Sequence, residues 1–204
     1  MNTLTKLFGG PAPVRVMRLF LLNPDRPFEL SDVAKKAIIS SRVARAELAR
    51  FLEAGLVKRI SFFTEISEKA KKGKIKKKRV SGFVLDQSFG HLYALRMLLF
   101  GADIVDKRDV VSRLQKAGKI KLVVLAGIFL RDDDGRIDLL VVGDGLSGKR
   151  LEHALRAIES DIGKELRYAA METKEFHYRL GMYDKFIRDV FDCPHEKLVD
   201  RIGI

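Results

Sequence analysis

The stretch "LSDVAKKAIISSRVARAELARFLEAGLVKRI", residues 30–60, combines apolar residues at helical spacing with short polar breaks. In its second half, Leu48 and Phe51 belong to one apolar stripe of a helix. Ser41 follows a short turn, and Gly55 stands where a helix is expected to end. The stretch therefore predicts a helix that begins at Ser41 and ends at Gly55.

A second, shorter helix precedes this one. We expect Ser31 to cap it and Ala37 to lie near its end. A tight turn over 38–40 then joins the two helices, which is typical of a helix-turn-helix. Outward from this pair, the sequence predicts a helix over 11–23, an extended connection over 26–30, strands over 56–63 and 79–85, and a basic loop over 67–78.

Two motifs within residues 10–86 carry a family resemblance. One is an opening Leu-Ser-x-Val-Ala over 30–34, and the other is an ending Leu-x-x-Phe-x-x-Ala-Gly-Leu-Val over 48–57. With the order helix, helix, helix, strand, basic loop, strand, they resemble the winged-helix family of ArsR and MarR-like bacterial regulators. The resemblance implies that the third helix enters the major groove of DNA. The chain lacks the cysteine-rich metal sensor of the arsenic-responsive members, so metal-driven release is not implied.

The resemblance implies DNA contacts from the start of the third helix and from the basic loop, or wing. Hydroxyl and backbone N–H groups at the helix start are expected to bind phosphate, and two arginines on one face to reach a guanine edge or a phosphate. The expected contact residues are Ser40, Ser41, Arg42, Arg45 and Arg50 on the helix, and Lys74, Lys76, Lys77, Lys78 and Arg79 in the wing. A lysine-rich loop that is merely solvated is the alternative.

Most of the excess positive charge lies in the first part of the chain. Residues 1–89 hold 19 of the 39 Lys and Arg but 8 of the 27 Asp and Glu, a net charge of +11, whereas residues 90–204 have a net charge of +1. Such a basic domain predicts a polyanionic partner, either nucleic acid or an anionic membrane surface, and the winged-helix resemblance implies double-stranded DNA. No apolar run is long enough to span a membrane, so we expect no membrane partner. A single cysteine, Cys193, predicts a cytoplasmic location.

The second part of the chain alternates buried strands with helices. Its predicted elements are helices over 91–101, 107–118, 147–165 and 174–191, strands over 120–129, 137–143 and 166–171, and a short final segment over 197–202. We expect a first domain over 1–88, a helical linker over 89–118 and a small α/β domain with a mixed sheet over 119–204.

The strand, glycine turn, strand, helix and strand over 120–171 resemble the minimal nucleotidyltransferase family. Active members of that family carry Gly-Ser after the first strand, Asp-x-Asp on the second strand and a third acid on a later strand. Asp-x-Asp places both carboxylates on one face of a strand, where they hold magnesium with the third acid.

Most of this pattern is missing from the chain. Gly127 occupies the glycine position, but Ile128 follows it in place of serine. Arg136 and Asp138 stand where the two aspartates belong, and Glu172 lies past the end of the third strand. We therefore expect a catalytically degenerate domain that binds no metal and no cofactor, and in which Arg136 forms an ion pair with Asp138.

Taken together, the sequence predicts an α+β protein with an N-terminal winged helix-turn-helix followed by a small nucleotidyltransferase-like α/β domain. The predicted function is a DNA-binding transcriptional regulator, expected to be a homodimer, whose second domain serves sensing, dimerisation or partner binding. Two alternatives stay open: an antitoxin-like or scaffold protein that binds a protein partner, and an active nucleotidyltransferase that acts on RNA or protein. A small anionic ligand of the second domain is a further open alternative.

Overall fold

The computed structural model describes residues 3–67, 75–101, 104–132 and 135–204. The chain is a mixed α and β protein with a two-stranded and a four-stranded sheet. It divides into two compact units, residues 1–102 with 160–164, and residues 103–159 with 165–204. This division splits the predicted linker over 89–118 between the units, and the predicted domain boundaries stay a prediction.

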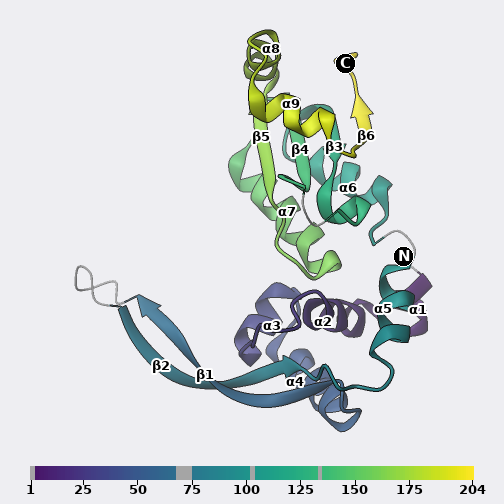
Figure 1. Ribbon diagram of the computed structural model, residues 1–204, viewed down its shortest axis with the longest axis vertical. Helices are drawn as coiled ribbons and strands as arrows, with labels where there is room; N and C mark the ends of the chain where they lie inside the picture. The colour runs from purple at the N-terminus through teal and green to yellow at the C-terminus, as the bar shows by residue number, and fades with distance from the viewer. Residues whose placement is uncertain (1–2, 68–74, 102–103, 133–134) are drawn as a thin grey trace. The chain divides into compact units, whose positions relative to one another are not determined.

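Helices packed around one apolar core form the main body of the first unit (Figure 1). They are α1 (Thr3–Leu7), α2 (Pro11–Leu21), α3 (Leu30–Lys36), α4 (Ser41–Glu53) and α5 (Leu92–Phe100). Phe20 of α2 and Leu48 of α4 are among the fully buried side chains of this core. The helix α4 begins at Ser41, and Gly55 follows its last turn with a φ of 77°, so both predicted ends of this helix are confirmed. Ser40 is its N-cap, a role that was not predicted from the sequence.

The start of α3 differs from the prediction. Its N-cap is Glu29, and the Asp32 carboxylate accepts a hydrogen bond from the Glu29 backbone N–H at 3.4 Å. This capping box moves the helix start upstream, so that Ser31 lies inside the first turn. The predicted cap at Ser31 is therefore wrong.

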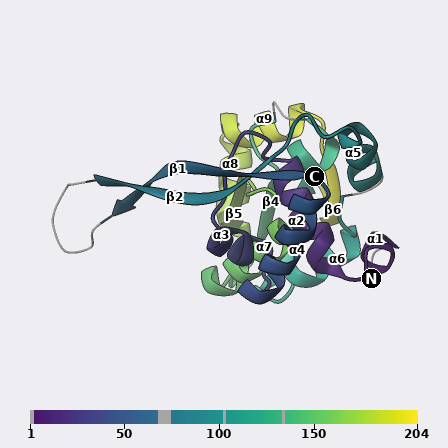
Figure 2. The ribbon, with the colours of Figure 1, turned by 90° about the horizontal axis from the view of Figure 1, so that it is seen from below.

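The strands β1 (Val57–Ser67) and β2 (Ile75–Leu85) form an antiparallel ribbon that extends away from the helices of the first unit (Figure 2). The pairing runs without a break from Val57 opposite Leu85, both buried, to Ser67 opposite Ile75. The predicted loop over 67–78 is therefore too long, because residues 76–78 already belong to β2. Lys74 lies outside the described residues.

A glycine in β2 allows two other groups to approach the ribbon closely. A Cβ atom at Gly82 would lie 2.4 Å from the Phe28 carbonyl oxygen and 2.7 Å from the Phe62 ring. Phe28 and Phe83 exchange two backbone hydrogen bonds of 2.9 Å, so the extended connection before α3 pairs with β2. Gly82 leaves the space for this approach, and the Phe28–Phe83 bonds join the base of the ribbon to the segment before α3.

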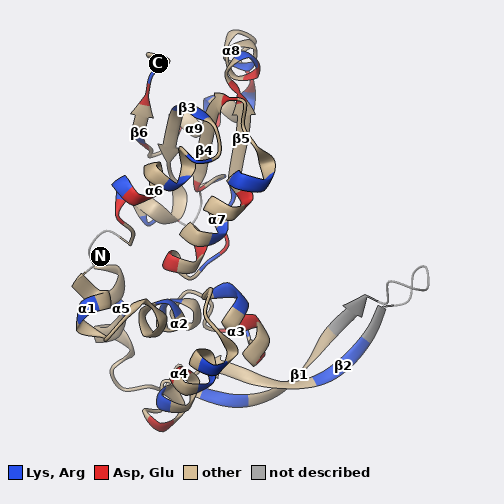
Figure 3. Ribbon diagram, turned by 180° about the vertical axis from the view of Figure 1, so that it is seen from behind, with Lys and Arg blue, Asp and Glu red and all other residues tan. Residues whose placement is uncertain are grey.

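The second unit contains a four-stranded mixed sheet with helices on both faces (Figures 1 and 3). Its elements are α6 (Lys107–Leu114), β3 (Lys119–Leu125), the 3-10 helix η1 (Gly127–Leu130), β4 (Leu139–Asp144), α7 (Gly148–Ile162), β5 (Tyr168–Glu172), α8 (Thr173–Gly181), α9 (Lys185–Asp192) and β6 (Glu196–Asp200). The strand order is β5-β4-β3-β6, and β4 with β5 is the parallel pair. The end of α7, from Ser160, is grouped with the first unit.

Buried residues on both faces of the central strands explain why this sheet lies between helices. Leu122 and Leu140 belong to a core that includes Phe176 of α8 and Ile187 of α9. Neighbouring residues of the strands, such as Val123, point to the opposite face and are also buried. The helix α7 lies on that second side of the sheet (Figure 3).

Two predicted elements of this unit are shorter than expected. The strand predicted over 120–129 ends at Leu125, because Gly127, with a φ of 50°, begins a 3-10 turn. The helix predicted over 174–191 is two helices, α8 and α9, separated at Tyr183, whose φ is 53°.

In the described part of the chain, every helix is too short or too polar to cross a membrane.

The turn between α3 and α4 holds Ile38 in the left-handed region, with a φ of 52°. Its N–H bonds the Lys35 carbonyl, and the Ile39 N–H bonds the Ala34 carbonyl, the Schellman pattern that usually places glycine at this position. A β-branched residue is strained in this conformation.

We expect Ile38→Gly to be more stable than Ile38→Ala by about 1 kcal/mol, because glycine alone avoids the left-handed strain. At exposed Ala49 inside α4, the order should reverse, and Ala49→Gly should lose about 1 kcal/mol. Urea unfolding of the three variants and the wild type measures both differences. An Ile38→Ala variant as stable as Ile38→Gly would contradict the strained turn.

Candidate functional site

One side of α4 is a narrow exposed stripe with two arginines and two alanines. Arg42, Arg45, Ala46 and Ala49 are all exposed, at spacings that place them along one side of the helix. The opposite side of α4 is buried in the core of the first unit. Small side chains beside the arginines leave room for another molecule to approach the helix backbone closely.

Two of the other expected residues, Ser40 and Arg50, have partners inside the protein. The Ser40 hydroxyl accepts a hydrogen bond from the Val43 N–H at 3.3 Å, so its oxygen caps the helix. The Arg50 guanidinium donates to both carboxylate oxygens of Glu47, at 3.2 and 3.1 Å. Ser41 is exposed at the first position of the helix. Arg42 and Arg45 are therefore the more available cations of this helix.

Sequence reasoning did not single out the two alanines, because alanine is a common residue of any helix and carries no chemical group that suggests a function. The available signal was the spacing of Ala46 and Ala49 from Arg42, four and seven residues along the helix, which predicts a shared side.

The ribbon adds a second group of cations in the first unit (Figure 3). Its exposed basic residues are Lys58, Arg59, Lys77, Lys78 and Arg79. Lys76 belongs to β2 and lies opposite Ile66 in the register. These cations lie on paired strands rather than in a loop. The register therefore sets which of them lie opposite each other across the ribbon.

In the second unit, Asp138 is a buried carboxylate with both oxygens bonded. It is 3% exposed and directly precedes β4. Oδ1 accepts from the Ile128 N–H and from the Arg167 guanidinium, each at 3.0 Å. Oδ2 accepts from the Arg167 N–H at 2.8 Å and from its Nε at 3.2 Å. This one side chain therefore holds together the segments next to β3, β4 and β5.

Gly127 is required by this arrangement. A Cβ atom at Gly127 would lie 2.2 Å from Oδ1 of Asp138, and the φ of 50° already favours glycine. The glycine that the sequence places after the first strand of the motif here makes room for a carboxylate of the chain itself. Gly127 and Asp138 are the two members of the predicted motif that the structure brings together.

The ionisation of Asp138 follows from its partners. Burial raises the pKa of this carboxyl, but the hydrogen bonds from Arg167 and Ile128 and the positive charge of Arg167 outweigh it. The net pKa lies below its usual value, so the carboxylate is charged at neutral pH.

The predicted ion pair between Arg136 and Asp138 is wrong. Arg136 lies 2.9 Å from the Asp189 carboxylate of α9, a distance that fits an ion pair although the contact lacks hydrogen-bond geometry. Glu172, the candidate for a third acid, accepts hydrogen bonds from the Gly145 and Leu146 N–H groups, both at 3.2 Å. Within the described ranges, no group of three or more His, Cys, Asp or Glu residues is arranged to hold a metal ion.

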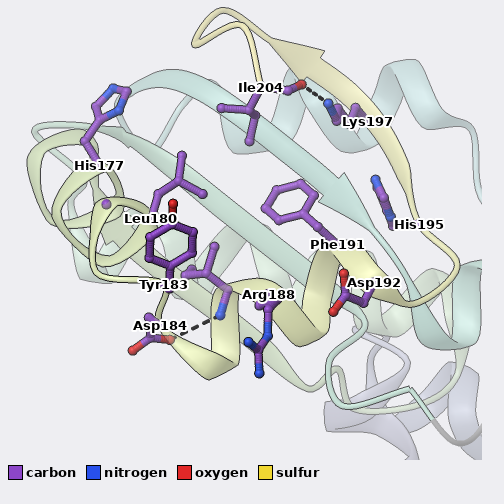
Figure 4. Close-up of a pocket in the computed structure, with 12 residues that line it drawn as sticks. His177, Leu180, Tyr183, Asp184, Arg188, Phe191, Asp192, His195, Lys197 and Ile204 are labelled. Carbon is purple, nitrogen blue, oxygen red and sulfur yellow. Dashed lines mark hydrogen bonds between the residues drawn. The ribbon is translucent and has the colours of Figure 1, made fainter.

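An open groove of about 750 Å³ lies between α8, α9 and β6 (Figure 4). Leu180, Ile187 and Phe191 give it an apolar lining, and Arg188 and His195 add polar groups. The prediction from sequence placed no site residue here. The groove lies where α8 and α9 meet, and the sequence predicts one unbroken helix there.

The comparisons with known proteins give no further guide to the site. No protein-family model matches the sequence, and neither the curated proteins nor the solved structures contain a significant match.

We expect Asp138→Asn to lower the free energy of unfolding by roughly 2–4 kcal/mol at neutral pH, because its amide group would face the Arg167 donors. The pKa of Asp138 is lowered on folding, so its stabilising effect is present above the unfolded pKa, about 3.9, and is lost as the pH falls through the folded pKa. The difference between wild type and variant should therefore shrink in acid.

The exposed Asp144, at the end of the same strand, provides the matched control. Asp144→Asn should change the free energy of unfolding little at any pH. A stability of Asp138→Asn equal to that of Asp144→Asn at neutral pH would refute the structural role of the buried carboxylate.

Proposed function

We propose that the chain is a DNA-binding transcriptional regulator whose first unit is a winged helix-turn-helix that binds double-stranded DNA. The observation that carries the proposal is the pair of exposed cationic surfaces in one unit, Arg42 and Arg45 on α4 and the row of cations on the β1–β2 ribbon. The net charge of +11 over residues 1–89 supports attraction to the phosphate backbone by release of bound counterions.

The division of labour between the two surfaces follows from their shapes. An α-helix fits the major groove, where arginine reads guanine with two hydrogen bonds. Ala46 and Ala49, beside the arginines, allow the backbone of α4 to come close to base edges. The cations of the ribbon bind phosphates, so they add affinity on any sequence.

For the second unit we propose a nucleotidyltransferase-like domain without catalytic activity, used for sensing, dimerisation or partner binding. The order β3, β4, α7, β5 supports the likeness, because it matches the strand, strand, helix, strand order of that family. The full set of hydrogen bonds on Asp138 supports a structural rather than a metal-binding role. The groove beside α9 supports a sensing role.

A homodimer is part of the proposal. Two winged helices on neighbouring half-sites gain affinity and specificity over a single one. Within the first unit, α5 supports this assembly, because Tyr93, Met97 and Leu98 are 78%, 52% and 47% exposed. Exposed apolar side chains grouped on one helix are typical of a surface that another chain covers.

The decisive experiment measures affinity for a duplex of about 20 base pairs as a function of salt. We expect affinity to fall about 10³-fold between about 50 and 200 mM salt if about six phosphates are bound. The triple variant Lys77→Ala, Lys78→Ala, Arg79→Ala should reduce the slope of log affinity against log salt by about 0.9 for each phosphate that the variant no longer binds.

A triple variant with the same change of charge in the second unit, Lys149→Ala, Lys174→Ala, Lys185→Ala, is the control, since all three residues are exposed. It should leave the slope nearly unchanged. Equal slopes for the two triple variants would remove the ribbon from the interface, and no binding by the wild type would remove the proposed function.

Base readout is tested on a duplex selected from a random pool by the wild type. Arg42→Ala or Arg45→Ala should cost about 1–3 kcal/mol on the selected sequence and little on random DNA, because an edge contact is specific to one base. Arg50→Ala is the matched control and should change both affinities alike, since Glu47 holds that guanidinium. Uniform losses for all three arginines would make α4 a backbone contact only.

A further inference from the structure

The register of the ribbon assigns each of its residues to one of two faces, because alternate residues of a strand point in opposite directions. One face carries Arg59, Ser61 and Phe63 from β1, opposite Phe83, Ser81 and Arg79 of β2. The other face carries Ile60 and Phe62, opposite Gly82 and Val80. The two faces cover the same length of the ribbon, so the exposure of their side chains can be compared directly.

Phe63 differs from the other phenylalanines of the ribbon in its exposure. Phe83, on the same face and nearer the base, packs against the core of the first unit. Phe62, on the opposite face, is half-buried, and its ring lies against Gly82. Phe63 is 68% exposed. An aromatic ring left in water forgoes most of the stabilisation, about 1.5–3 kcal/mol, that full burial gives.

The residues around this ring are cationic or small. Arg79 lies directly opposite Phe63, and Arg59 and Lys77 lie on the same face, all three exposed. Ser61 stands two residues before Phe63 on β1, and Ser81 faces it across the ribbon. In the backbone register, Glu65 lies opposite Lys77. A single ring thus projects from a positively charged surface next to two short hydroxyl side chains.

We propose that Phe63 inserts between neighbouring base pairs of duplex DNA, while the cations of the same face bind the flanking phosphates. This inference rests on the proposed function and adds a contact to it. Apolar side chains that insert at a base step partly unstack it and kink the duplex, and every base offers an aromatic face for stacking. Phe63 lies six residues beyond Val57, about 20 Å along the strand, so the ribbon presents the ring well beyond its base.

The chain contains no tryptophan, so Phe63→Trp creates a single fluorescent reporter at the proposed point of insertion. Stacking on bases should quench its emission when duplex DNA is added, and affinity should stay within a few-fold of the wild type. Ile60→Trp places the same reporter on the opposite face, where 40% of the native side chain is exposed. Its emission should change little on the same duplex.

Loss of the ring is measured with Phe63→Ala in parallel with Ile60→Ala. Phe63→Ala should weaken duplex binding by about 5- to 100-fold, the effect typical of removing one stacking interaction, without changing the salt slope. Ile60→Ala should bind like the wild type. Circular dichroism and the unfolding temperature of each variant ensure that folded proteins are compared.

Several results would overturn the insertion of Phe63. One is duplex binding by Phe63→Trp with unquenched emission, and another is quenching by single-stranded but not by duplex DNA. A change of molar mass in Phe63→Ala without a change in DNA affinity would assign the ring to a contact between copies of the chain. Binding of an end-labelled duplex by the wild type is measured first. If the wild type does not bind DNA, the proposed function itself is overturned, whereas the results above overturn only the insertion of Phe63.

Discussion

Electrostatic repulsion along β2 is the constraint on which this account depends. Lys77, Lys78 and Arg79 are three consecutive exposed cations on one strand of a ribbon whose buried residues, including Val57 and Leu85, lie at its base. The repulsion between neighbouring cations is unfavourable in the free protein and is relieved when a polyanion binds. The backbone pairing with β1 holds these cations in place, and the Phe28–Phe83 bonds join the ribbon to the segment before α3. Folding of the first unit therefore creates a concentrated positive surface.

In the second unit, Gly127 and Asp138 have structural roles. The sequence places both in a motif that resembles a catalytic pattern, and each has a local physical role at the ends of the central strands. Asp138 accepts hydrogen bonds from the segments next to β3 and β5, and Gly127 leaves the space that its carboxylate needs. These contacts hold together the segments next to β3, β4 and β5. The division that we propose, between DNA binding by the first unit and sensing or assembly by the second, uses this domain as a structural element.

Local signals in the sequence predict much of the fold. Gly55 predicts the end of α4 because a left-handed C-terminal residue acts within a few residues of the helix. The segment over 76–78 is predicted as a loop because nothing in a run of lysines reveals the backbone pairing that makes it a strand. The partner predicted for Asp138 is wrong because Arg167 is 29 residues away and meets it only in the folded sheet. The same holds for the candidate site. The sequence predicts the exposed arginines of α4 from helical spacing, but it does not predict which residues of the ribbon share a face, because that depends on strand register.

The central claim is that the first unit binds DNA through α4 and the ribbon. Backbone amide hydrogen exchange of the full chain, with and without duplex DNA, tests this claim most directly. The account predicts slower exchange over 41–53, 57–67 and 75–85 when DNA is bound, and unchanged exchange in the sheet strands over 139–144 and 168–172. Slower exchange confined to the sheet of the second unit, under conditions where binding is complete, would contradict it.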